Sequence, residues 1–285
     1  MELKPPKTTT EQLEILKERN LIIESEERAL EILQSINYYT FTGYLYQHKN
    51  KSGKYEDISF EQAHRIYQCD MRIRSIILYA TESAERNLKT KISYVIAHNH
   101  GALAYTDVSL FKDVDMHSKM MEMFTKSINR NSSVDFVSHH IKKYDSQFPV
   151  WVATELFTLG MLHMFYRNLK TGIQKQIAKS FGLGPVYLTS WMESVAYLRN
   201  LCAHYMRLYR FNINQTPKQS LHHNKTTSSN KIFDIIYVLK YLVADRNDWN
   251  NYVLQKFSQI FDEYNDCVSP HDYGFPEDWL SVLKI

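Results

Sequence analysis

The sequence predicts an all-α fold, a helical bundle that forms a single domain over residues 1–285. The chain has 285 residues, of which 44% are hydrophobic, so it is long enough to bury a sizeable core. It contains only 8 glycines and 7 prolines, which are few for a protein built on hairpins and tight turns. Over long stretches, apolar residues recur every three or four positions, which is the periodicity of amphipathic helices.

The overall composition argues against several other classes of protein. Cys69, Cys202 and Cys267 lie far apart and form no Cys-x-x-Cys pair, so neither a disulfide framework nor a thiolate zinc site is indicated. The N-terminus lacks the apolar stretch of a signal peptide, and the most apolar segment, 151–165, is too short and polar to span a bilayer. We therefore expect a cytoplasmic protein that does not contact membranes, with free thiols and a mildly basic net charge of +3.

The first half of the chain predicts two short helices, an aromatic cluster and one long helix. Amphipathic spacing places the short helices at about 10–20 and 25–36. The aromatic cluster of residues 38–46 is interpreted as core, with a base-stacking platform as the alternative. Ser59–Gln62 has the form of a capping box, and neither Gly nor Pro follows before His98. This stretch is therefore one long helix, or two helices joined by a kink.

The second half predicts a further series of helices, interrupted by a polar loop. Apolar periodicity places these helices at about 113–129, 133–144, 149–169, 172–181, 185–210, 231–245 and 250–265. Residues 212–230 are rich in Asn, Gln, Thr, Ser and His, which predicts a flexible loop or insertion. Glu155 lies on an apolar helix and is expected to need a partner, either an active-site residue or a structural Arg.

The helix predicted at 185–210 carries the candidate chemistry. At 100° per residue, its apolar stripe consists of Trp191, Val195, Leu198, Cys202, Tyr205 and Tyr209. Arg199 lies at the border of this stripe, whereas Asn200 and His204 share another face, with Arg207 near them. Polar groups that cluster on one face need partners or solvent, so this cluster is not explained by packing.

The spacing of Arg199 and His204 bears on how such a site is assembled. The two residues are five apart, which separates them by about 140° on a straight helix. Either the helix is distorted, or a second copy of the same helix completes the site. A symmetric dimer across this helix places two Arg and two His in one cleft, so we expect a homodimer.

These residue types suit the cleavage of RNA. A His with an ordinary pKa moves protons at neutral pH, and an Arg neutralises charge on a pentavalent phosphate and grips its oxygens. The 2′-hydroxyl of RNA supplies the nucleophile, so no metal is required, and Asn200 would orient the imidazole or hold a phosphate oxygen. The spacing Arg-x4-His is weak evidence by itself, because a structural His beside a surface Arg gives the same pattern.

The surrounding sequence resembles a known family. The run Arg-Asn-Leu-Cys-Ala-His at 199–204 resembles the Arg-Asn-x-x-Ala-His signature of the Abi (abortive infection) family, a branch of the HEPN superfamily, and is AbiD/AbiF-like. The resemblance extends to four further segments, in order along nearly the whole chain: Lys4-Pro5-Pro6-Lys7-Thr8-Thr9, Tyr38 to Tyr46, Phe148-Pro149-Val150-Trp151, and Gly274-Phe275-Pro276-Glu277-Asp278-Trp279.

The resemblance implies a HEPN-like helical bundle with additional N- and C-terminal helices, a role in bacterial anti-phage defence, and RNA as the substrate. In that superfamily the motif Arg and His are catalytic, the polar residue after the Arg assists, and sites commonly form across a dimer. Carried over to this sequence, these residues are Arg199, His204 and Asn200. Some members instead act as toxins held by a partner, as RNA binders or as inactive scaffolds.

A line of arginines along the long helix is a further candidate for RNA binding. Arg65, Arg72 and Arg86 fall on a seven-residue line, with Tyr79 between them. Such a line tracks a phosphate backbone while the Tyr stacks a base, or it is an ordinary solvated face; we favour the second interpretation. The dense histidines 98–100, 139–140 and 222–223 lack carboxylate or Cys partners at suitable spacing, so no metal site is predicted.

Taken together, the sequence predicts a metal-independent endoribonuclease of the HEPN type that needs no cofactor. His204 is its expected general acid or base, Arg199 stabilises the transition state, Asn200 positions one of them, and Arg207 binds phosphate. The alternative is a non-catalytic HEPN-like module that binds RNA or protein in a defence or toxin–antitoxin system. Its expected partners are RNA, a second copy of the chain, and a regulatory RNA or antitoxin-like molecule.

Overall fold

The computed structural model describes residues 5–219 and 228–285, and it is all-α in these ranges, as predicted. Only isolated backbone bridges, and no named strands, occur among these residues. The polar loop predicted at 212–230 lies partly outside the described residues, as do the histidine pair 222–223 and Lys4.

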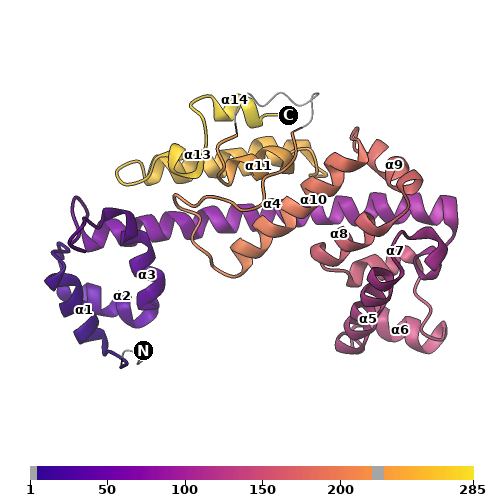
Figure 1. The fold of residues 1–285 in the computed structure, drawn as a ribbon, viewed down its shortest axis with the longest axis horizontal. Coiled ribbons are helices and arrows are strands. Elements are labelled where there is room, and N and C mark those ends of the chain that lie inside the picture. The colour runs from indigo at the N-terminus through magenta and orange to yellow at the C-terminus, as the bar shows by residue number, and fades with distance from the viewer. Residues whose placement is uncertain (1–4, 220–227) are drawn as a thin grey trace.

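One helix, α4 (Phe60–His100), forms the axis of the molecule (Figure 1). It begins at the predicted capping box: Gln62 donates its backbone N–H to Ser59 Oγ at 3.1 Å, and Ser59 donates its backbone N–H to Gln62 Oε1 at 2.9 Å. It ends at Gly101, whose φ of 94° belongs to the region that favours glycine. The 41 residues are one helix rather than two and span about 62 Å.

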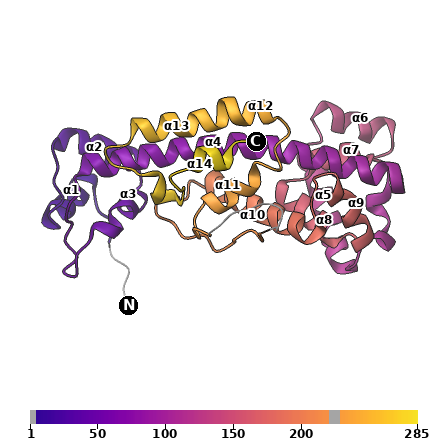
Figure 2. The same cartoon turned by 90° about the horizontal axis from the view of Figure 1, so that it is seen from above.

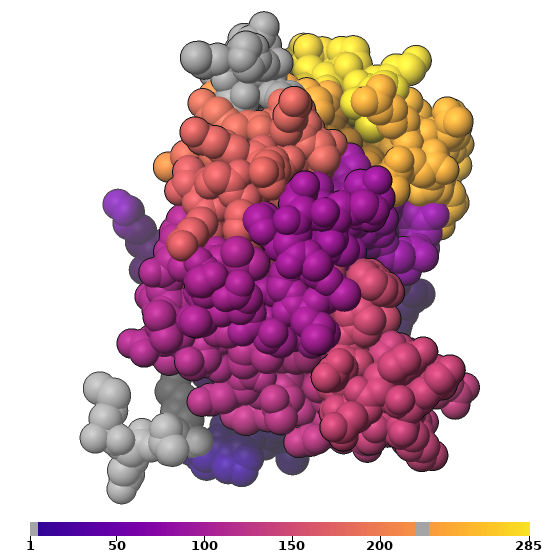
Figure 3. All heavy atoms as spheres, turned by 90° about the vertical axis from the view of Figure 1, so that its right-hand side faces the viewer, coloured from indigo at the N-terminus to yellow at the C-terminus, as the bar shows by residue number. Residues whose placement is uncertain are grey.

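The other helices pack around α4 in three groups (Figures 1 and 2). The N-terminal end of α4 carries α1 (Thr9–Glu18), α2 (Glu26–Ser35) and α3 (Tyr38–Leu45). The C-terminal end carries α5 (Val114–Arg130), α6 (Asp135–Lys143), α7 (Val150–Ala153), α8 (Leu159–Asn168) and α9 (Thr171–Lys179). Seen from this end, their side chains form one continuous surface (Figure 3).

The middle of α4 is flanked by the third group. On one side α10 (Pro185–Ala203) crosses it, and on the other α12 (Arg246–Asp248) and α13 (Leu254–Glu263) run alongside it (Figure 2). The short helices α11 (Phe233–Leu239) and α14 (Trp279–Leu283) complete this group. The end of α10 therefore lies near the centre of the molecule, between the two terminal groups of helices (Figure 1).

The aromatic cluster at 38–46 is partly core and partly surface. It forms α3, which the sequence analysis missed; Asn37 begins this helix by accepting the Tyr39 backbone N–H at 2.9 Å. Phe41 and Tyr44 are buried, as predicted for core, whereas Tyr39 is 86% exposed. At 100° per residue, the buried and the exposed rings lie on different faces of one short helix.

The prediction of a single apolar helix at 149–169 is wrong. The segment is broken into α7, a 3-10 turn (Thr154–Leu156) and α8. Phe157 takes an extended conformation that buries its ring, and Thr158 restarts the helix because its hydroxyl accepts the Met161 backbone N–H at 3.2 Å. The break leaves the Glu155 side chain exposed, so this carboxylate does not need the partner expected for it.

Candidate active site

The helix that carries the motif ends at Ala203, whereas the sequence analysis extended it to Arg210. Tyr205 donates its backbone N–H to Cys202 O at 3.1 Å, and Met206 donates to Leu201 O at 2.9 Å. This pair of bonds is a Schellman motif, which requires a left-handed residue at Tyr205, where φ is 57°. Glycine is usual at that position, so its absence from the sequence hid the end of the helix.

His204 is consequently the first residue beyond α10 rather than part of its surface. Its backbone N–H still reaches Asn200 O at 3.0 Å, but the angle of an ideal helix no longer describes its side chain. The imidazole is exposed, and no hydrogen bond or ion pair engages it within the part of the chain that the structure describes. The ring nitrogens are therefore accessible from solvent.

Arg199 and Asn200 form a pair on the last turns of α10. Arg199 donates Nη1–H to Asn200 Oδ1 at 3.1 Å, so the structure places Asn200 beside Arg199 rather than beside the His204 ring. Over residues 5–219 and 228–285, no carboxylate forms an ion pair with Arg199. Its remaining N–H groups are available for an anionic group such as a phosphate.

A pocket of about 240 Å³ lies between Arg199 and α4. Its α4 side is lined by Leu78, Thr81, Glu82, Glu85, Arg86 and Lys89. Arg86 pairs with Glu82 at 3.0 Å, and Lys89 pairs with Glu85 at 3.0 Å. With Arg199 added, three cations face two carboxylates, which leaves the pocket positive. Arg86 is the member of the predicted arginine line that the structure brings next to the motif.

A buried network fixes the chain directly after the motif. The fully buried Asp70 carboxylate of α4 accepts the Tyr44 hydroxyl at 2.7 Å, the Arg74 guanidinium at 2.5 Å and the Leu208 backbone N–H at 3.0 Å. Arg74 also donates to Met206 O at 3.3 Å. Asp70 and Arg74 therefore hold both ends of the segment 206–208. This network was not predicted from the sequence, although an Asp and an Arg four residues apart within the apolar stripe of α4 were a signal for it.

Burial and pairing act in opposite directions on the charges of this network. Burial raises the pKa of Asp70, while Arg74, the Tyr44 hydroxyl and the Leu208 amide oppose that shift. Burial alone lowers the pKa of Arg74, but the Asp70 charge and Tyr44 outweigh it, so the net shift is upward. The Asp70 carboxylate and the Tyr44 hydroxyl therefore stabilise the Arg74 cation, and this cation in turn favours the ionised form of Asp70.

Three of the predicted phosphate-binding arginines are engaged in structural contacts. Arg207 donates to the backbone carbonyl of Gly43 and so ties the end of the motif to α3. Arg65 pairs with Asp266 at 2.6 Å, and Arg72 pairs with Glu263. The guanidinium groups of Arg65 and Arg72 also lie 5.0 and 5.2 Å from the centre of the Tyr264 ring. Both residues thus attach the end of α13 to α4, a role that helical spacing cannot show.

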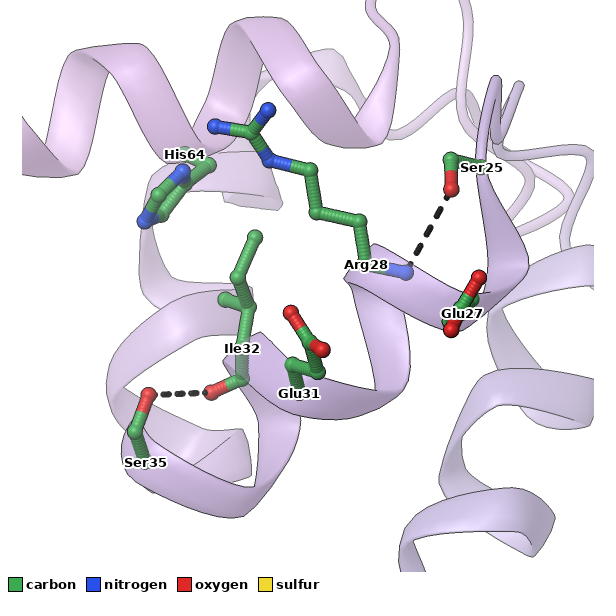
Figure 4. Close-up of a pocket in the computed structure, with 7 residues that line it drawn as sticks. All are labelled: Ser25, Glu27, Arg28, Glu31, Ile32, Ser35 and His64. Atoms are coloured by element: carbon green, nitrogen blue, oxygen red, sulfur yellow. Dashed lines mark hydrogen bonds between the residues drawn. The ribbon is translucent and has the colours of Figure 1, made fainter.

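A larger pocket, of about 610 Å³, lies between α2 and the start of α4 (Figure 4). Arg28 and His64 both reach into it, and the pKa of His64 is lowered by burial and by the Arg28 charge. His64 precedes Leu78 by 14 residues, about 21 Å along α4, so this pocket is separate from the motif.

The described ranges lack two other kinds of functional feature. No group of three or more His, Cys, Asp or Glu side chains that would hold a metal ion is found in them. None of the described helices is long and apolar enough to cross a membrane.

Comparison with known proteins yields one match. A family model described as Abi-like protein matches residues 31–210, which include α3, α4, α10 and the motif at 199–204. The match leaves out the segments 4–9 and 274–279 that also carried the resemblance in the sequence. No curated protein and no solved structure matches the chain.

Proposed function

The chain belongs to the Abi-like protein family, and from that premise we propose that it is a metal-independent endoribonuclease of the HEPN type that acts in abortive-infection defence against phage. The observation that carries the proposal is the end of α10: an exposed, unpaired imidazole at His204 follows an Arg199–Asn200 pair that no carboxylate neutralises within residues 5–219 and 228–285. This arrangement supports proton transfer and phosphate binding at one accessible place.

In the proposed reaction, the 2′-oxygen of a ribose attacks the adjacent phosphorus and the bond to the 5′-oxygen breaks. His204 serves as the general acid or base of this step. Arg199 stabilises the charge that develops on the phosphate oxygens, and Asn200 holds its guanidinium in position. Arg86, whose side chain is exposed across the pocket from Arg199, is a second basic group that an RNA strand would meet there.

We further propose that a homodimer forms at this end of α10. Tyr205 is 78% exposed and Met206 is 49% exposed, directly after His204. Tyr and Met are enriched at protein interfaces, and two-fold symmetry brings the same helix end of both copies together.

The proposal is tested by RNA cleavage in excess chelator, comparing the wild-type protein with His204→Ala and Arg199→Ala. We expect cleavage by the wild type only, and none when the substrate carries 2′-deoxyribose at the cleaved position. Activity that requires a divalent metal, or that survives both substitutions, would contradict the mechanism. Tight RNA binding without cleavage, unaffected by His204→Ala, would instead favour a non-catalytic RNA-binding module.

A further inference from the structure

A groove of about 400 Å³ runs between α4 and α13. These helices lie side by side, with α10 on the other flank of α4 (Figure 2). The groove is lined by Arg72, Ser75, Ile76 and Tyr79 from α4, and by Tyr252, Lys256, Gln259, Ile260 and Glu263 from the facing segment. Neither the motif nor the pocket beside Arg199 contributes to it.

Two exposed tyrosines, one from each side of this groove, contact each other. The rings of Tyr79 and Tyr252 are 4.8 Å apart at their centres and inclined by 53°, and they are 43% and 41% exposed. Tyr79 donates its hydroxyl to Asp248 Oδ1 at 2.9 Å, which fixes the orientation of its ring. The two side chains therefore present a pre-oriented aromatic surface to solvent.

A π-helical turn presents the second of these tyrosines. The regular helix predicted from residue 250 is wrong at its start, because Trp249–Val253 forms a π turn. Trp249 and Val253 are buried, and the Trp249 indole donates to Leu283 O at 2.9 Å, while Tyr252 stays outside. π turns are rare and occur frequently at functional sites.

The charge in the groove comes from Lys256. Arg72 is already paired with Glu263, whereas Lys256 Nζ bonds to the neutral Gln259 at 3.0 Å and lies 5.8 Å from the Tyr252 ring centre. No ion pair engages Lys256 in the described ranges. An aromatic surface beside an available cation is the combination by which proteins bind unpaired bases of single-stranded nucleic acid.

We propose that this groove binds an unpaired base of single-stranded RNA, which stacks on Tyr79 and Tyr252 while Lys256 contacts an adjacent phosphate. The choice of RNA rests on the proposed function, but the site is distinct from the motif. Tyr79 and Arg86 are seven residues apart on α4, about 10 Å along its axis. The groove and the pocket beside Arg199 are thus about two helical turns apart along α4, on different flanks of this helix.

The test measures binding of a fluorescent single-stranded oligouridine to the full chain carrying His204→Ala, so that cleavage does not enter the readout. Adding Tyr79→Ala and Tyr252→Ala is expected to weaken binding at least about tenfold. Tyr39→Ala, which removes a tyrosine on α3 that is exposed to a greater extent (86%), is the control and should leave affinity unchanged. Lys256→Gln should reduce the salt dependence of binding by about one counterion.

Folding is checked by circular dichroism, and the pair Tyr79→Phe with Tyr252→Phe keeps the rings should the alanine variants not fold. These phenylalanine variants are expected to keep most of the parent's affinity, because both rings remain and only the Tyr79 hydroxyl bond that orients one of them is lost. Unchanged oligouridine affinity in a folded double-alanine variant, or a parent that binds none, overturns the proposal. Another outcome is a wild type that binds oligouridine without cleaving RNA and a double-alanine variant that loses this binding. That result would contradict the proposed nuclease activity and would leave the proposed base-binding groove standing.

Discussion

Asp70 offers a way to separate the stability of the fold from the position of the active-site motif. Its buried carboxylate holds Arg74, the Tyr44 hydroxyl and the Leu208 backbone N–H. Asp70→Ala leaves the Arg74 guanidinium buried without its counter-charge, and removing one partner of a buried ion pair costs about 3–5 kcal/mol. We therefore expect the free energy of unfolding to fall by that amount, measured by urea denaturation followed by circular dichroism.

A double variant provides the matched control. Asp70→Leu with Arg74→Met removes both charges and fills similar volume, and such apolar replacements of buried ion pairs are often neutral or stabilising. Stability should return to within about 1–2 kcal/mol of the wild type. RNA cleavage by the double variant should nevertheless be lower than wild-type cleavage, because Met206 O and Leu208 N–H lose the partners that fix the segment after His204.

Two outcomes would refute this reasoning. If the free energy of unfolding of Asp70→Ala lies within about 1 kcal/mol of the wild-type value, the Asp70–Arg74 pair does not stabilise the fold as a buried ion pair should. A double variant that regains both stability and cleavage would show that the network supports the fold without positioning the motif.

Three further predictions follow from single contacts. In denaturant titrations, the free energy of unfolding of Tyr205→Gly should be about 1 kcal/mol higher than that of Tyr205→Ala. Both variants lack the ring, and only the alanine keeps the strain of the left-handed conformation; equal stabilities would contradict this. Arg28→Ala should raise the pKa of His64 in an NMR titration, since the Arg28 charge lowers it. Because protonation of His64 opposes folding, stability falls as the pH drops below about 6.5, and Arg28→Ala should lessen that loss; an unchanged titration argues against the contact. Arg65→Ala should leave RNA affinity unchanged and cost at most about 1 kcal/mol, as expected of its exposed pair with Asp266; weakened RNA binding would restore Arg65 as a phosphate contact.

Elements that depend on local signals were predictable from the sequence. The start of α4 is encoded by Ser59 and Gln62 and was predicted correctly. Apolar periodicity without Gly or Pro predicted either one long helix or two joined by a kink, and the structure has one. The break before α8 was predictable in principle, because Thr158 is a good cap, but the unbroken apolar run around it concealed the signal.

Features that depend on distant contacts were not predictable. α10 ends at Ala203 without a glycine, and Asp70 and Arg74, more than 130 residues earlier, hold the segment that follows. The groove beside Tyr79 likewise needs Tyr252, which a π turn brings to α4. The sequence identified Arg199, Asn200 and His204 as candidates. Spacing on an ideal helix misplaced His204, because the helix ends at Ala203, directly before it, and not at Arg210.

That correction sharpens the prediction of a composite site. Arg199 lies on the last turns of α10 and faces α4 across a pocket, and its guanidinium bonds to Asn200. His204 lies beyond the helix end, and its ring forms no hydrogen bond with either side chain. If the Arg of one copy acts with the His of its partner, mixing inactive Arg199→Ala and His204→Ala proteins must restore activity. In a hybrid dimer one site has lost both groups and the other is intact.

Random exchange of subunits makes half of the dimers hybrids, each with one intact site of two, so the mixture should reach about a quarter of wild-type cleavage. Light scattering must show a dimer under the same conditions. The control is the His204→Ala protein taken through the same procedure without Arg199→Ala, because its dimers contain no intact site. A mixture that stays as inactive as its parents, despite verified exchange, would place Arg199 and His204 of a single chain in each site and would leave the dimer without a catalytic role.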